Sequence, residues 1–170
     1  MIRDMRMAGY DPDRTGTFGI VTATADQFVF ALNNPDNPGN ALTLSYDLYS
    51  PSYTDTDALG RRADAGARSA IAENIEELEF LYVLADGTPK LTPTAAQLAD
   101  IRSVQVSILA RARFPDRNYT HNQFYCPASN PLVQNTGDCL DPDGTKWKPA
   151  NDHIRRRFQV MTVQLRNMGL

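Results

Sequence analysis

Alternating apolar and polar residues run through most of this chain, and they predict a structure made mainly of β-strands. The most regular run is Ser103–Arg113, in which every even position is apolar, as in a strand with one buried side. We expect this strand to lie centrally in a sheet. Weaker patterns of the same period predict strands at Thr17–Ala23, Asp26–Leu32 and Ala41–Tyr49.

Two further segments fit either a helix or a strand. Leu59–Arg62 fits a short strand or a helix start, and we favour the strand because Asp64–Ala67 then forms a turn into the next one. The Ala and Glu content of Ala70–Leu81 suits a helix, whereas Ile75–Leu84 carries apolar residues at period two. The residue pattern leaves that second choice open.

Turn and cap residues separate these elements. The Asn- and Pro-rich run Asn33–Asn40 predicts a hairpin turn between its two flanking strands. Thr94 and Gln97 form a capping-box pattern after Pro93, which predicts a short helix to about Ile101. The last strand, Arg156–Arg166, has apolar residues on both faces, so we expect an interior strand partly covered by a helix.

The first ten residues predict a short amphipathic helix. Ile2, Met5 and Ala8 recur three apart and form one apolar stripe. Gly9 and the Asp11-Pro12 pair then end the helix. An isolated helix of this length is marginal in water, so we expect it to be the end of a longer helix and to pack on a sheet through its stripe.

The composition indicates one globular domain spanning residues 1–170. A chain of this length buries roughly 70% of the surface that it exposes when unfolded, enough for a real core. The net charge of −3 exerts no overall attraction for nucleic acid or anionic lipid. Its apolar runs are far shorter than the roughly 20 residues that span a bilayer.

The two cysteines, Cys126 and Cys139, lie in a stretch rich in Pro, Asn, Gly and Asp. A disulfide between them would stabilise this irregular segment by about 3 kcal/mol in the chain-entropy model. Two unrelated free thiols remain the alternative. A zinc site with His121 and His153 is less favoured, because the four residues lack the close paired spacing of zinc ligands.

Candidate catalytic chemistry is sparse, so we expect no enzyme and no cofactor. His121 and His153 come with no nucleophile motif, and nucleotide-binding glycine patterns and His-Glu-x-x-His are missing from the sequence. Three acidic pairs could bind calcium, but turn chemistry is the favoured interpretation because further ligands are missing. These pairs are Asp11/Asp13, Asp55/Asp57 and Asp141/Asp143.

Arginines cluster on two predicted strands. If these strands are neighbours, their arginines form a basic stripe for a partner or for single-stranded nucleic acid. The favoured alternative is that they face water or pair with the glutamates of residues 76–79, given the net acidity. The candidate surface consists of Arg111, Arg113, Arg155, Arg156 and Arg157.

Three segments together resemble the PilW-like minor pilins of type IV pilus systems and, more distantly, the J-type minor pseudopilins of type II secretion. They are the start ending in Arg6-Met7-Ala8-Gly9-Tyr10, the strand Asn74–Tyr82 and the final strand Arg155–Asn167. The resemblance implies an α+β pilin-like fold, with the helix packed on an antiparallel sheet, and it favours the strand at Ile75–Leu84. The family's basic leader, processing site and apolar half-helix are absent here, so we expect Met1 to lie within the helix.

The resemblance also implies a function in assembly. We expect a minor subunit that helps initiate a pilus and sits near its tip, contacting other minor pilins, the major pilin and a tip adhesin. The missing half-helix would anchor the protein in the inner membrane, with the domain outside the cytoplasm. Residues Asn118–Asn151 would form the variable region that faces partners.

Overall fold

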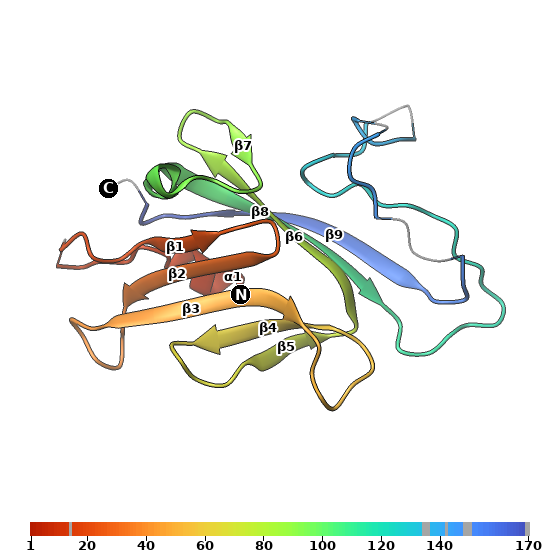
Figure 1. Cartoon of the computed structure of the whole chain (residues 1–170), viewed down its shortest axis with the longest axis horizontal. Coiled ribbons are helices and arrows are strands. Elements are labelled where there is room, and N and C mark those ends of the chain that lie inside the picture. Colours follow the sequence, from red (N-terminus) through yellow and green to blue (C-terminus); the bar gives the residue numbers. More distant parts are fainter. Residues whose placement is uncertain (14, 134–136, 142, 148–150, 169–170) are drawn as a thin grey trace.

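The computed structural model describes residues 1–13, 15–133, 137–141, 143–147 and 151–168, and within them the chain forms two antiparallel sheets and a short helix (Figure 1). The first sheet has the order β1-β2-β3-β4-β5, and the second has the order β7-β6-β8-β9. The elements are α1 (Ile2–Arg6), β1 (Ile20–Ala23), β2 (Gln27–Asn33), β3 (Ala41–Tyr49), β4 (Ala58–Ala63), β5 (Ser69–Glu73), β6 (Ile75–Leu84), β7 (Pro89–Lys90), the 3-10 helix η1 (Ala95–Asp100), β8 (Ile101–Arg111) and β9 (Arg156–Gln164).

The five-stranded sheet is a meander in which each strand pairs with the next along the chain. The hairpin predicted around Asn33–Asn40 joins β2 and β3, and its register sets Phe30 opposite Leu44. The pattern did not identify β5 as a separate strand. Its Ala-rich composition suits a helix as well, and only its pairing with β4 makes it a strand.

The four-stranded sheet contains the strand with the clearest period-two pattern, β8, between β6 and β9, as predicted. The prediction for β9 was wrong in one respect. In the described residues β9 pairs only with β8, so it is an edge strand and not an interior one. Its second apolar face, at Phe158, is covered by Tyr125 and Trp147 of the segment that precedes it.

The main core lies where the two sheets and α1 meet. Phe28 and Phe30 of β2 lie among Tyr46, Phe80 and Tyr82, with ring centroids 5.1 to 6.2 Å apart. Figure 1 shows α1 behind the strands of the five-stranded sheet. Met5 and Ala8 are fully buried in this core.

Hydrogen bonds join the two sheets beyond the apolar contacts. The Tyr82 hydroxyl donates to the carbonyl oxygens of Thr24 (2.8 Å) and Gln27 (3.0 Å), on either side of the β1–β2 turn. Asn74 passes the chain from one sheet to the other with φ +58°, a left-handed conformation that Asn tolerates better than most residues. No helix in the described ranges is long and apolar enough to cross a membrane.

Candidate interaction surfaces

Helix α1 is tied to the five-stranded sheet through Asp4 as well as through its buried stripe. Asp4 Oδ2 accepts hydrogen bonds from the Tyr46 hydroxyl (2.5 Å) and from Arg61 Nε (2.9 Å). Burial alone would raise the pKa of Asp4, but these two hydrogen bonds outweigh it and hold the pKa below its ordinary value. Burial and the bond to Asp4 together raise the pKa of the Tyr46 hydroxyl. The helix is therefore fixed in orientation by a polar contact within a mostly apolar interface.

The chain after α1 is held by backbone geometry. Gly9 has φ +72°, and its N–H donates to the Ala31 carbonyl oxygen at 3.1 Å. A Cβ at this position would lie 2.7 Å from Met168 Sδ. Glycine suits this position because it tolerates both the left-handed conformation and the close approach of the C-terminal segment.

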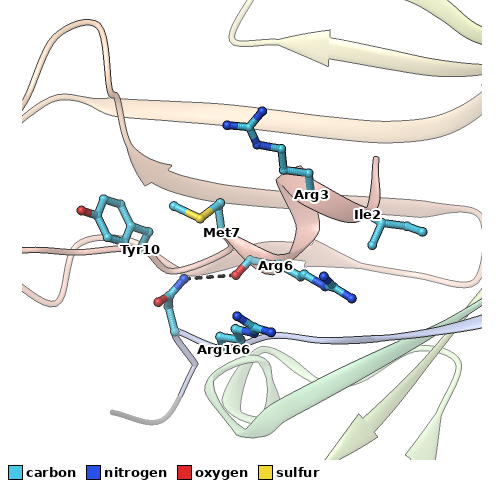
Figure 2. A pocket seen from close by; sticks show the side chains of 7 residues that line it. Ile2, Arg3, Arg6, Met7, Tyr10 and Arg166 are labelled. Carbon is cyan, nitrogen blue, oxygen red and sulfur yellow. Dashed lines mark hydrogen bonds between the residues drawn. The ribbon is translucent and has the colours of Figure 1, made fainter.

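Between α1 and this C-terminal segment lies a hollow of about 470 Å³ (Figure 2). Three of its lining residues are arginines, namely Arg3, Arg6 and Arg166. Ile2, 39% exposed, lies on the same surface, so the structure places it at the rim while Met5 and Ala8 are buried. The other lining residues are Met7, Tyr10 and Asn167, and the Asn167 side chain donates to the Arg6 carbonyl oxygen at 3.1 Å.

The segment between β8 and β9, residues 112–155, is called the disulfide loop here. Cys126 and Cys139 are bonded within it, as predicted, with Cα atoms 5.5 Å apart. Asn130 is also buried. Its side-chain amide donates a hydrogen bond to the Asp141 carbonyl oxygen at 2.8 Å and accepts one from the Asp141 N–H at 2.7 Å. These contacts give the loop an interior although its described residues form no long strand or helix.

Polar bonds attach the disulfide loop to the outer face of the four-stranded sheet. The buried Glu79 carboxylate of β6 accepts hydrogen bonds from both the Ser129 N–H (3.0 Å) and the Ser129 hydroxyl (2.7 Å). Ser107 Oγ of β8 accepts the Ala128 N–H at 2.8 Å. The loop segment beside the disulfide is therefore held against the sheet.

Ring contacts hold the rest of the disulfide loop. Tyr125 stacks on His121 with centroids 5.7 Å apart and contacts Phe158 of β9 at 5.4 Å. His121 is fully buried, and its Nδ1 lies 2.9 Å from the Tyr119 hydroxyl oxygen. Trp147 meets Phe158 edge-on at 5.7 Å, so it covers the sheet.

The arginines of the predicted basic surface are brought together, because Arg111 of β8 lies opposite Arg156 of β9. Arg156, however, is 1% exposed at its side chain and is paired with Glu76 and Asp152. The hydrogen bonds from Arg156 lower the pKa of Asp152 despite partial burial. Arg155 pairs with Asp116 at 2.7 Å.

The two remaining members of this surface are exposed. Arg113 lies over the ring of Phe114, with the guanidinium carbon 5.5 Å from the centroid, and Arg157 is exposed on β9. Carboxylates therefore neutralise the centre of the row. What remains is a few separate cations and not a continuous basic stripe.

Two of the three acidic pairs of the sequence take part in local turns. Asp11 Oδ2 accepts the Gly16 N–H at 2.7 Å, and Asp141 Oδ1 accepts the Asp143 N–H at 3.0 Å. Within the described residues, no three His, Cys, Asp or Glu side chains are grouped in a way that could hold a metal ion.

Sequence reasoning missed two contacts that position these surfaces. The bond between Asp4 and Tyr46 joins residues 42 positions apart, and the bond between Glu79 and Ser129 joins residues 50 apart. A local pattern carries no signal for either pairing. Glu79 is one of three glutamates in the first half of β6, so the sequence did not single it out.

Comparison with known proteins agrees with this architecture. The family model described as Type IV Pilus-assembly protein W matches residues 37–167. A type IV-like pilin from Thermus thermophilus has a similar structure, with a TM-score of 0.63 and 15% identity, over 99% of this chain and 93% of that one. No curated protein sequence matches the chain. Because the family match covers well over half of the sequence and the fold is that of a pilin, the chain belongs to the PilW family of type IV pilus-assembly proteins.

Proposed function

We propose that this protein is a minor pilin that helps to initiate assembly of a type IV pilus and sits near the tip of the fibre. The family match over residues 37–167 carries this proposal, because the family is described by pilus assembly. The pilin-like fold supports it, since pilins act as structural subunits. In this proposal the protein works by contact with other minor pilins and with the major pilin, not by catalysis.

The proposed location is outside the cytoplasm. The disulfide between Cys126 and Cys139 supports it, because disulfides persist in oxidising compartments. We propose that a longer form of α1 anchors the protein in the inner membrane before assembly and that the domain faces the periplasm. The disulfide loop is then the region that faces partners at the tip, with a tip adhesin among the candidates.

A gene deletion tests the initiating role. We expect far fewer surface fibres by electron microscopy, with restoration by the full-length protein. Normal fibre numbers would contradict a role in initiation. Unchanged fibres together with lost protein secretion would instead indicate a minor pseudopilin.

Immunogold labelling of the disulfide loop tests the location. We expect gold at one end of each fibre, because a subunit that starts assembly stays at the tip. Labelling along the whole fibre would contradict the proposed position.

A further inference from the structure

The hollow beside α1, called the arginine pocket here, contains cations without acidic partners. Among the described residues, no carboxylate forms an ion pair with Arg3, Arg6 or Arg166. Arg6 and Arg166 both line this pocket, and their side chains point the same way in the view of Figure 2. Cations that line one pocket repel each other, so an anion bound among them would lower the electrostatic energy.

The acidic residues next to the pocket along the chain are already engaged. Asp4 accepts hydrogen bonds from Tyr46 and Arg61, and Asp11 accepts them from Thr15 and Gly16. The disulfide loop, with its several aspartates, is attached to the other face of the four-stranded sheet through Glu79 and Ser107. Within the described residues, the carboxylates of Asp4 and Asp11 are therefore not available to the pocket, and we take its anion to come from another molecule.

The lining of the pocket suits a peptide better than a small inorganic ion. Ile2, Met7 and Tyr10 supply apolar surface beside the arginines. Guanidinium groups bind carboxylates through paired hydrogen bonds, and the apolar side chains offer contacts to the residues between those carboxylates. Apolar surface flanked by cations fits an acidic segment with interspersed apolar residues.

We propose that the arginine pocket binds an acidic segment of a neighbouring pilin subunit. This inference rests on the proposed function, because it takes the neighbour to be another subunit of the same fibre. The residues that line the pocket are exposed or partly exposed, whereas Met5 of α1 and Ala8 just after it are buried in the core. A subunit bound there contacts α1 and the C-terminal segment together.

Charge argues against two other classes of anionic partner. The whole chain carries a net charge of −3, so long-range forces oppose adsorption to an anionic membrane or to nucleic acid. Membrane-binding basic clusters usually contain four to eight cations, more than the three arginines here. A short acidic segment needs only the local field of the pocket.

The first test uses a fluorescent peptide of alternating Glu and Leu, with a Gln-for-Glu peptide as its control. We expect the domain to bind the Glu peptide, and binding to weaken as salt is raised. The double variant Arg6→Glu with Arg166→Glu should bind about tenfold more weakly or worse, because reversed charges repel the carboxylates. The matched control, Arg62→Glu with Arg117→Glu, changes two exposed arginines elsewhere and should bind like the unchanged domain.

The second test uses the purified soluble domains of the sibling pilins. We expect at least one of them to bind, to lose about tenfold in affinity for the Arg6/Arg166 variant, and to regain it when its own acidic segment is changed to arginine. Circular dichroism of each variant checks that the exposed substitutions leave the fold intact.

The possible failures are distinguishable. Sibling binding that the Arg6/Arg166 variant leaves unchanged would overturn the pocket and leave the proposed function standing. Failure of every sibling to bind, with the peptide result as expected, would count against the proposed function and support the chemistry of the pocket. Stronger, arginine-dependent binding to phosphatidylglycerol vesicles or to a single-stranded oligonucleotide than to the Glu peptide would overturn the proposal.

Discussion

The two-sheet core and the disulfide loop are stabilised in different ways. The core buries aromatic and aliphatic side chains of α1 and of the two packed sheets around Phe28 and Phe80. Where the structure describes it, the disulfide loop has only isolated bridges between its residues, such as Tyr125 with Trp147, and it depends on a disulfide, buried polar bonds and ring contacts. A region without regular backbone pairing has to satisfy its polar groups through side chains. The substitutions below therefore test whether the core and the disulfide loop are stabilised independently.

The largest expected effect is in the core. Phe80→Ala should lower the free energy of unfolding by about 3 to 5 kcal/mol, because it leaves a cavity where the sheets meet. Urea denaturation followed by circular dichroism measures the change. Phe114→Ala, at a ring that is 73% exposed, is the control and should have little effect. Equal effects of the two substitutions would show that burial does not determine the stability of this region.

The next effect concerns the covalent link of the loop. Replacing Cys126 and Cys139 together by Ser should cost about 3 kcal/mol, since the unfolded chain gains freedom. Hydrogen exchange should rise first in the disulfide loop and least in β6 and β8. A uniform rise across both regions would contradict the separation between core and loop.

A smaller effect is expected where the loop meets the sheet. Glu79→Gln keeps the side-chain shape but loses a charged acceptor of two hydrogen bonds from Ser129, which should cost about 2 kcal/mol. Limited proteolysis of the loop and urea denaturation measure the local and the global change. Glu77→Gln, at an exposed position of the same strand, should cost nothing. A stability loss as large for Glu77→Gln would rule out the anchoring role of Glu79.

The smallest effect is a dependence on pH. Arg156 holds the pKa of Asp152 below its ordinary value in the folded protein, so the unfolded chain binds the proton more readily. The contribution of this pair is therefore complete above the ordinary carboxyl pKa of about 4 and is lost as the pH falls through the lower, folded value. Because Asp152 is partly exposed, we expect less than about 1 kcal/mol.

Denaturation between pH 7 and pH 2 measures this slope. Asp152→Asn should flatten it, because the substituted side chain does not titrate. An unchanged slope would show that the ion pair with Arg156 does not contribute to acid sensitivity.

Local pattern was sufficient for most strands and insufficient for how they combine. The period-two run of β8 and the turn around Asn33–Asn40 were predictable, because side-chain alternation and turn preferences act over a few residues. Strand β5 was not, because an Ala-rich segment suits either state until a partner strand is present. The sequence pattern also could not predict that β9 is an edge strand, because an apolar face has the same residue pattern whether a sheet or a loop covers it.

The candidate surfaces were likewise predictable only in part. The disulfide was predictable because two cysteines in one irregular segment have few alternatives. The sequence also showed which arginines cluster on β8 and β9, but not that Glu76 and Asp152 neutralise Arg156 at the centre of the row. The pair between Arg156 and Glu76 depends on the register of three strands, β6, β8 and β9.

By itself, the sequence determined the strands with regular alternation, the short amphipathic start and the cysteine pair, because each depends on neighbours along the chain. Only the tertiary structure decided that there are two sheets, that Asp4 joins Tyr46 and Arg61, and that Arg6 and Arg166 line one pocket. Those arrangements join residues from 42 to more than 150 positions apart. The physical reason is that packing and charge act through space, where distance along the chain does not matter.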